Sequence, residues 1–258
     1  NPRKNLLIII PAYNEEKNIS KVLDDLEQSK VTQIADVLVM NDASSDSTNW
    51  VVKERDHALV THVFNLGYGS ALQLGYKYAI RRKYQYVIQM DADGQHDVCN
   101  IPVIYESLQT KDAEGNYPDL VLGARFLKES SEFPVSGVRK LAYHFFCIMV
   151  RICTGRKIAD PTTGLQGLSR RAFLYYSKYK NFDSRYPDAN MITQMLLLKF
   201  RVLEIPAVMH ARIAGVSMHS GLKPLFYMMN MFLSIITVWF RFRVLKVDLG
   251  VSQEVAER

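Results

Sequence analysis

Two aspartates separated by one residue, Asp91 and Asp93, follow directly on the apolar run of residues 86–90. A chain leaving a buried strand can aim alternate side chains at one point, and Gln95 adds a neutral oxygen two residues later. Hard cations such as Mg²⁺ and Mn²⁺ bind carboxylate oxygens while substrate phosphates complete the coordination shell. The spacing therefore predicts a site for a divalent metal and a nucleoside diphosphate, although a solvated turn after a strand has the same pattern.

Other ligand-binding loops are excluded by their spacing. An EF-hand calcium loop does not fit, because Gly94 comes too early and Pro102 stands where a bidentate Glu is needed. The Gly67-x-Gly69 turn lacks the third glycine of a dinucleotide fingerprint, which indicates a tight turn. The chain has no Gly-Lys-Ser or Gly-Lys-Thr phosphate loop, and its histidines match no zinc pattern.

The elements that must position these residues alternate through the first half of the chain. The expected strands are residues 6–10, 35–40, 59–63 and 86–90, and the expected helices are residues 16–28, 48–55 and 70–82. This order predicts an α/β fold with a mostly parallel central sheet flanked by helices.

Ligands of such sheets bind outside the carboxyl ends of the strands, and polar residues cluster at four of these ends. The four loops are residues 11–15, 41–46, 65–69 and 91–93. Each loop alone also fits a turn or a helix cap, with Asp46 or Ser47 as a candidate N-cap. Four loops at one sheet edge favour a binding crevice.

Bulk properties narrow the function classes. A chain of 258 residues fits one domain, and its net charge of +6 favours contact with phosphates or an anionic membrane surface. Nucleic acid is not an expected partner, because no helix-turn-helix, zinc-finger spacing or aromatic platform accompanies the basic residues. Cys99, Cys147 and Cys153 form neither a CxxC nor an even set, which predicts buried free thiols in a reducing compartment.

Five motifs occur in one order along the chain. They are Pro-Ala-Tyr-Asn-Glu-Glu at 11–16, Asn-Asp-Ala-Ser-Ser-Asp at 41–46, Asp-Ala-Asp-Gly-Gln-His at 91–96, Gly-Ala-Arg-Phe at 123–126 and Asp-Pro-Thr-Thr-Gly at 160–164. Together they resemble the inverting glycosyltransferases of family two, and most of all the polyprenyl-phosphate sugar transferases related to dolichol-phosphate mannose synthase. This resemblance implies a GT-A fold that takes a sugar from a nucleoside diphosphate sugar with Mg²⁺ or Mn²⁺.

The resemblance also implies roles for individual residues. The nucleoside would be held by Pro11, Ala12, Tyr13, Glu15 and Asp42, with Asp42 facing the base. The metal would be held by Asp91, Asp93 and Gln95, with Asp91 also facing the ribose. The diphosphate would be contacted by Arg125 and by Arg212, which shares a motif with Ser217. His219 is a further candidate for this contact from its place close behind them. A metal and fixed Arg donors suit this chemistry, because negative charge grows on the departing diphosphate.

The acceptor decides what Asp160 would do. A lipid phosphate is already an anion at neutral pH and needs little help from a base, so Asp160 would orient the nucleophile or the sugar. A hydroxyl acceptor would need Asp160 as general base, and a plain turn before Pro161 is the structural alternative. Arg139 matches a basic position that would bind the acceptor phosphate, or it lies on a solvated helix face. Asp160, Asp93 and Arg139 are therefore the residues expected to carry catalysis.

Two positions depart from the family pattern. Gln166 stands where the synthases usually carry Arg, which removes a cation from the phosphate region. Asp188 stands near where relatives carry a Glu on the helix beside the acceptor, and the sequence assigns it no role.

The C-terminal part, residues 222–258, is expected to be a membrane-associating helical segment after a catalytic domain of residues 1–221. Residues 224–240 carry no charge, and Arg241, Arg243 and Lys246 follow. A helix of this length reaches roughly 26 Å, short of the roughly 30 Å hydrocarbon core. A helix lying in the membrane interface or docked on a partner is favoured over a core helix or a true span. The loop of residues 128–135 is expected to order on ligand binding.

The leading hypothesis is a metal-dependent transferase of a hexose or N-acetylhexosamine. It would move the sugar from a nucleoside diphosphate sugar, UDP being favoured, to a polyprenyl phosphate such as undecaprenyl phosphate, for cell-envelope glycans. We expect it at the cytoplasmic face of the membrane, peripheral or monotopic, and a small membrane protein is among the partners considered. The alternatives are a glycan hydroxyl acceptor, a nucleotidyltransferase and a non-catalytic membrane-associated binding subunit.

Overall fold

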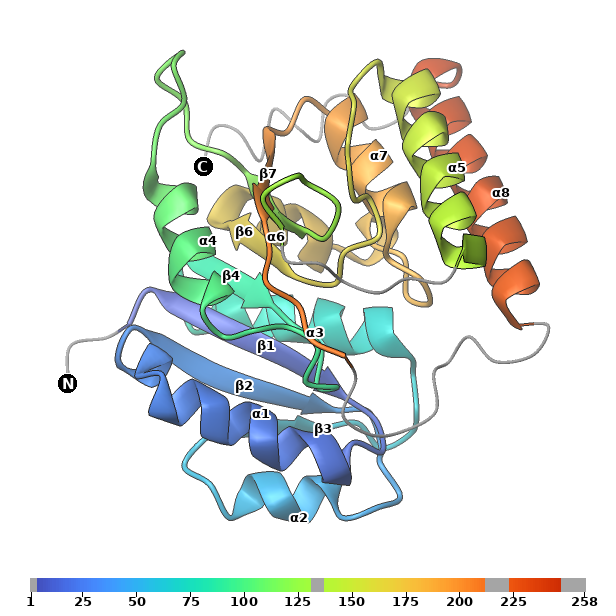
Figure 1. Cartoon of the computed structure of the whole chain (residues 1–258). Coiled ribbons are helices and arrows are strands. Elements are labelled where there is room, and N and C mark those ends of the chain that lie inside the picture. Colours follow the sequence, from blue (N-terminus) through green and yellow to red (C-terminus); the bar gives the residue numbers. More distant parts are fainter. Residues whose placement is uncertain (1–3, 131–136, 212–222, 247–258) are drawn as a thin grey trace.

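The computed structural model describes residues 4–130, 137–211 and 223–246 of the 258-residue chain. These residues form one seven-stranded sheet in the order β3-β2-β1-β4-β6-β5-β7, with helices on both faces (Figure 1). The strands are β1 Leu6–Ala12, β2 Ala35–Asn41, β3 Ala58–Thr61, β4 Tyr86–Gln89, β5 Leu120–Ala124, β6 Gln166–Ser169 and β7 Val202–Pro206. The predicted α/β fold with a mostly parallel sheet is confirmed.

The helices cover this sheet in two layers. They are α1 Glu16–Gln28, α2 Thr48–Lys53, α3 Tyr68–Arg81, α4 Asn100–Gln109, α5 Gly137–Thr154, α6 Arg170–Ser177, α7 Ala189–Leu197 and α8 Lys223–Arg243. Alternate residues of β1 face opposite layers, as the period of a strand requires. Leu6, Ile8 and Ile10 pack with α1, α2 and α4, whereas Leu7 and Ile9 pack with α3, α6 and α7.

Strand β6 runs antiparallel to both of its neighbours, β4 and β5. The other described strands run parallel to one another, so their carboxyl ends lie at one edge of the sheet. Because β6 is reversed, the segment that enters it, residues 160–165, lies at this same edge. The reversal therefore adds the Asp-Pro-Thr-Thr-Gly motif to the loops that end β1, β2, β4 and β5.

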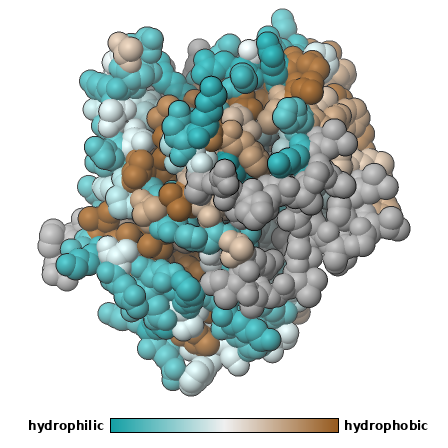
Figure 2. Space-filling model, in the orientation of Figure 1, coloured by the Kyte–Doolittle hydropathy of each residue, from teal (hydrophilic) through white to brown (hydrophobic). Residues whose placement is uncertain are grey.

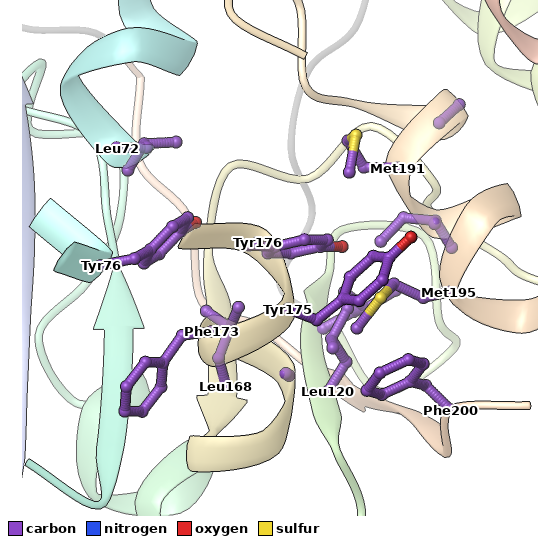
Figure 3. Close-up of a cluster of buried hydrophobic side chains, with 14 of the residues drawn as sticks. Leu72, Tyr76, Leu120, Leu168, Phe173, Tyr175, Tyr176, Met191, Met195 and Phe200 are labelled. Carbon is purple, nitrogen blue, oxygen red and sulfur yellow. The ribbon is translucent and has the colours of Figure 1, made fainter. Parts of the chain in front are cut away.

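An aromatic core anchors α3 and α6 behind this edge (Figure 3). The rings of Tyr76 and Tyr176 lie 5.9 Å apart, and Phe182 packs edge-on against Tyr76 at 5.4 Å. The Tyr76 hydroxyl donates to Gln89 Oε1, and Gln89 Nε2 donates to the carbonyl of Gly164 at 3.3 Å. Buried polar groups need such partners, so the core fixes the start of β6 through defined hydrogen bonds.

Several predicted boundaries were wrong. Strand β3 ends at Thr61 rather than residue 63. Val63 is apolar but 84% exposed, so its hydrophobicity did not indicate a buried strand position. Helix α2 ends at Lys53, and α3 begins at Tyr68. The three cysteines are free as expected, but of the three only Cys153 is buried, whereas Cys147 is half-buried and Cys99 is exposed.

Helix α8 packs beside α5 and α7 (Figure 1). Its side chains of Met231, Ile235 and Phe242 are buried in the same core as α7. Among the residues that the structure describes, no helix combines the length and apolar character needed to cross a membrane. Helix α8 therefore has the contacts expected of a core helix on one side, while its other side is exposed.

Exposed apolar side chains are frequent on α8, and α5 adds two of them beside its exposed Lys140, His144 and Arg151. Hydrophobic residues gather there at the upper right of Figure 2. The exposed side chains include Ile148 and Ile152 on α5 and Phe226, Met229, Leu233, Ile236 and Phe240 on α8. Exposed apolar patches of this kind commonly mark contact with a protein or a membrane.

Candidate active site

The site begins at Asp91, directly after β4. Its Oδ1 accepts a hydrogen bond from the Tyr68 hydroxyl at 2.9 Å, and its Oδ2 lies 3.1 Å from His96 Nε2. Burial opposes ionisation of Asp91, yet the hydrogen bonds from His96 and Tyr68 and the charges of His96 and Arg125 hold its pKa below the ordinary range. The carboxylate is therefore held both in orientation and in its charged form.

Gly164 lets this carboxylate approach the Asp-Pro-Thr-Thr-Gly loop. A Cβ at residue 164 would lie 2.5 Å from Asp91 Oδ2, closer than nonbonded atoms can come. Only glycine fits this approach, so the motif's last residue has a steric reason to be glycine.

Asp93 and Gln95 lie in the same turn as Asp91, and all three are partly exposed. Asp93 Oδ1 accepts from the Gln95 amide at 3.0 Å. Among the described residues, no group of three or more His, Cys, Asp or Glu is arranged to hold a metal ion. Two carboxylates with an amide oxygen fit a cation that takes the rest of its shell from phosphates and water, as Mg²⁺ does.

The segment after β7 is fastened to this acidic loop. The His210 amide donates to the Gln95 carbonyl at 2.8 Å, and His210 Nε2 lies 2.6 Å from Asp97 Oδ2. His96 Nδ1 lies 3.0 Å from Met209 Sδ. The chain then continues into the expected diphosphate contacts Arg212, Ser217 and His219, which lie outside the described residues.

Arg125 and Asp160 form a bidentate ion pair. Arg125 Nε and Nη2 donate to the two carboxylate oxygens at 2.7 Å each, and the Arg125 amide adds a third bond at 3.0 Å. Asp160 is 0% exposed. Burial works against the charge of Arg125, but the ion pair with Asp160 outweighs it and raises the Arg125 pKa. The structure thus pairs Asp160, the expected general base for a hydroxyl acceptor, with Arg125, an expected diphosphate contact.

The remaining face of Arg125 is directed toward α5. Arg125 Nη1 donates to the Tyr143 hydroxyl at 3.3 Å, and the guanidinium lies 4.9 Å from the Tyr143 ring centre. Thr162 accepts from Nη2 at 2.9 Å. Arg139 lies one turn before Tyr143 in α5, but its side chain lies outside the described part of the structure.

Glu204 on β7 supports the loop that carries Asp160. Both of its oxygens accept from the Ala159 amide at 2.9 Å, and one also accepts from the Asp160 amide at 2.9 Å. Burial raises the pKa of Glu204, the two amides oppose the shift, and the Asp160 charge adds to it. Sequence reasoning missed this residue, because nothing in the chain connects β7 to residues 159–160.

At the expected nucleoside end, Asp42 is 3% exposed. Its oxygens accept from the amides of Leu66 at 2.9 Å and Gly67 at 2.8 Å, and His62 Nδ1 lies 2.6 Å away. Asp42 therefore fastens the β3–α3 loop, where Gly67 adopts a φ of 92°. Its expected contact with the base stays a prediction.

The other expected nucleoside contacts surround the end of β1. Pro11 and Ala12 are its last residues and are buried, while Tyr13 is 49% exposed. The Glu15 amide donates to Thr48 Oγ1 at 2.9 Å, and Asn18 donates to Glu15 Oε2 at 2.6 Å. The structure brings β1 and α2 together here, leaving the Tyr13 ring accessible to a planar ligand.

Asp188, which the sequence left without a role, belongs to the same cluster. Its Oδ2 accepts from the Tyr227 hydroxyl of α8 at 2.6 Å. Burial raises its pKa to about 6; the Tyr227 bond and Arg125 oppose the shift, whereas the charges of Asp91 and Asp160 add to it. The motif preceding α7 could have suggested Asp188, but no sequence signal pointed to Tyr227.

The fold and the site define an α/β transferase of the GT-A type, with acidic and basic loops at the carboxyl edge of its sheet. The model of the family described as "Glycosyl transferase family 2" matches residues 7–176, more than half of the chain. The chain belongs to this family and is a glycosyltransferase.

Named relatives transfer sugars to polyprenyl phosphates. The chain is 28% identical to an undecaprenyl-phosphate mannosyltransferase of Micrococcus luteus over 84% of this chain and 88% of that protein. It is 27% identical to a polyprenol monophosphomannose synthase of Mycolicibacterium smegmatis over 85% and 83% of the two chains. A dolichyl-phosphate beta-glucosyltransferase of Trichomonas vaginalis is 29% identical over 66% of this chain, which spans 55% of that protein.

A solved structure with the same fold is glucosyl-3-phosphoglycerate synthase from Mycobacterium tuberculosis, in complex with Mn²⁺, UDP and glucosyl-3-phosphoglycerate. The TM-score is 0.63 over 92% of this chain and 79% of that one, with 18% sequence identity. At this identity the likeness establishes the GT-A fold alone.

Proposed function

We propose that this glycosyltransferase moves a hexosyl or N-acetylhexosaminyl group from a UDP-sugar to a polyprenyl phosphate, with inversion at the anomeric carbon. The reaction would take place at the membrane surface, on the cytoplasmic face where nucleotide sugars are available. The observation that carries this proposal is the state of Asp160. Its carboxylate is fully buried and bound by Arg125 through both oxygens.

A carboxylate in this state is poorly suited to take a proton from a sugar hydroxyl. A general base must reach the proton it abstracts, and Arg125 already occupies the Asp160 oxygens. An acceptor phosphate needs no base, because it is ionised at neutral pH. The arrangement therefore favours a phosphate acceptor, in agreement with the polyprenyl-phosphate acceptors in the names of the relatives.

The donor end of the site suits a nucleoside diphosphate. Asp91, Asp93 and Gln95 would hold Mg²⁺ or Mn²⁺, and the bound cation would stabilise the charge that develops on the leaving diphosphate. Tyr68 and His96 keep the Asp91 carboxylate oriented, and Arg125 contributes fixed positive charge nearby. Arg212, Ser217 and His219 are proposed to contact the diphosphate, and Arg139 the acceptor phosphate.

The exposed apolar faces of α5 and α8 support contact with a membrane surface. Arg241 and Arg243 lie in the last turn of α8, where they can meet anionic headgroups. The same helices supply Tyr143 and Tyr227 to the site. A lipid carrier could therefore keep its chain at the membrane while its phosphate reaches the donor.

Transfer of radiolabel from UDP- and GDP-sugars to undecaprenyl phosphate, with Mg²⁺ or Mn²⁺, tests the proposal. Label should enter the organic phase with one donor and disappear with Asp93→Ala and with chelation of the metal. A parallel reaction with dolichyl phosphate compares carriers. Label that stays in the aqueous phase with every donor, while UDP and Mn²⁺ still bind, would refute the lipid-phosphate acceptor.

A further inference from the structure

Helix α8 contributes the side chain of Tyr227 to the site. Its hydroxyl donates to Asp188 Oδ2 at 2.6 Å, while its ring packs edge-on against Phe146 at 6.2 Å and Tyr186 at 5.5 Å. The ring is thus held on two sides, so the hydroxyl oxygen cannot move away from Asp188 unless the ring leaves these packing contacts. A short hydrogen bond to a carboxylate belongs to the stronger class of hydrogen bonds.

The position of Asp188 makes this bond more than helix packing. Asp188 lies within electrostatic range of Asp91 after β4, Arg125 after β5 and Asp160 before β6. Tyr227 itself interacts with Asp188, Tyr143 and Arg125. The hydroxyl therefore lies where the acidic loop, the ion pair and α5 meet.

A second hydrogen bond between α7 and α8 provides a contrast. Asn190 Nδ2 donates to Ser234 Oγ at 2.8 Å, and the same amide group donates to Asp183 Oδ2 at 2.8 Å. Asn190 is 1% exposed. The Asn190–Ser234 bond is a neutral pair and involves no carboxylate of the Asp91–Arg125–Asp160 cluster. Asn190 Oδ1 also accepts from the Asp188 amide at 2.9 Å, a bond that does not need Ser234.

We propose that Tyr227 is a positioning residue for the transfer reaction, and that it acts by holding the Asp188 carboxylate in the site. Helix α8 then completes the active site, and does not only attach the enzyme to a membrane. This inference rests on the proposed transferase function, since Asp188 is assigned to the reaction cluster. It predicts that loss of the Tyr227 hydroxyl slows transfer even to an acceptor that needs no membrane.

Tyr227→Phe and Ser234→Ala form a matched pair for the test. Each removes one hydroxyl and one hydrogen bond between α8 and residues 188–190, while Tyr227→Phe keeps the ring contacts. Transfer from the UDP-sugar is measured with farnesyl phosphate, a short polyprenyl phosphate, together with hydrolysis of the donor by water. We expect kcat to fall about tenfold or more for Tyr227→Phe and to stay within about twofold for Ser234→Ala.

The double variant separates a positioning role from a structural one. If Tyr227 acts through Asp188, Tyr227→Phe added to Asp188→Asn lowers kcat no further than Asp188→Asn alone. Equal melting temperatures and equal vesicle binding of Tyr227→Phe and Ser234→Ala should accompany the difference in kcat. Multiplicative losses in the double variant, or equal rates for the two single variants, overturn the proposal.

The wild-type enzyme tells the two proposals apart. If it hydrolyses the donor but does not glycosylate farnesyl or undecaprenyl phosphate, the acceptor assignment fails. The single and double variants of Tyr227 and Asp188 are then compared by their rates of donor hydrolysis. If the wild type transfers and the variants match it, only the role of Tyr227 fails. Absence of both activities overturns both proposals.

Discussion

At the scale of single residues, the structure changes how Asp160 is understood. The sequence presented it as a free carboxylate in a turn, either a base or an orienting group. In the fold it is the buried partner of Arg125, and its backbone amide is held by Glu204. A buried ion pair contributes little net stability, but removal of one partner leaves an uncompensated charge in the interior.

Asp160→Asn should therefore destabilise the protein as well as reduce transfer. We expect the free energy of unfolding in urea to fall by about 3–5 kcal/mol, because Arg125 loses its buried counter-charge. The control is Asp160→Asn with Arg125→Met, which removes both charges and should recover part of the stability without restoring transfer. Unchanged unfolding of Asp160→Asn would contradict the importance of the pair.

Asp188 should make stability depend on pH. Burial raises its pKa in the fold to about 6, whereas an ordinary Asp titrates near pH 4, so the folded chain holds this proton more tightly. The resulting contribution is fully present below about pH 4 and is lost as the pH rises through about 6. With partial exposure taken into account, it amounts to about 1–2 kcal/mol.

Urea unfolding at several pH values, without nucleotide or metal, checks this contribution. Relative to the wild type, Asp188→Asn should gain stability as the pH rises from about 4 to about 6, because it cannot lose the proton. Asp183→Asn serves as a control carboxylate on the same segment. A constant difference between wild type and Asp188→Asn across this range would contradict the raised pKa.

At the scale of elements, the site depends on contacts between segments far apart in the chain. Strand β7 supplies Glu204 to residues 159–160, and the segment after β7 pairs with the acidic loop through His210. Strand β6 enters the sheet in the reverse direction and so brings the Asp160 loop to the edge where β4 and β5 end. The Asp160 loop is thus held by β7, and the acidic loop by the segment that follows β7.

Glu204→Gln should disturb the Asp160 loop while keeping the shape of the side chain. The amide group can accept from only one side, and its NH₂ would face an N–H of Ala159 or Asp160, so a buried donor loses its partner. We expect a loss of about 1–3 kcal/mol in stability and a lower kcat. Glu204→Ala, which introduces no opposing donor, is the companion variant.

Thermal unfolding and transfer kinetics measure both variants. The structure predicts that transfer falls in each, because both lose the carboxylate that fixes residues 159–160. If Glu204→Gln and Glu204→Ala transferred sugar at the wild-type rate, β7 would have no part in positioning the Arg125–Asp160 pair.

At the scale of the whole molecule, polar and apolar surfaces are separated. The acidic loop, the ion pair and the Asp42 loop lie at one sheet edge, whereas exposed apolar residues gather on α5 and α8, which pack beside each other away from that edge (Figure 1). Tyr143 and Tyr227 connect the two, because each lies on one of these helices and contacts a residue of the site.

Ile152→Asp with Leu233→Asp should weaken binding to phospholipid vesicles at least about tenfold, because each places a charge on the apolar face at a side chain that is 73% or 54% exposed. Val103→Asp on α4, at a side chain 50% exposed, is the control on another surface. Sedimentation with anionic and neutral vesicles gives the affinities. Equal losses for the control and the double variant would show that this face is not the membrane contact.

The sequence by itself determined the alternation of β1, α1, β2, α2, β3, α3 and β4, because the apolar periods of two and 3.6 residues are local properties of the chain. It also determined the acidic loop of residues 91–95 and the ordered family motifs, since carboxylate spacing and glycine positions are readable without a fold. The resemblance placed Arg125 and Asp160 among the functional residues.

Only the tertiary structure decided how these residues act. The reversal of β6, the Arg125–Asp160 pair, the Glu204 support and the Tyr227–Asp188 bond all join residues at least 35 positions apart. Such contacts depend on strand order and on which helices cover a face, and no local pattern records either. The exposed Val63 failed as a strand residue for the same reason, because hydrophobicity describes a side chain and burial describes its neighbours.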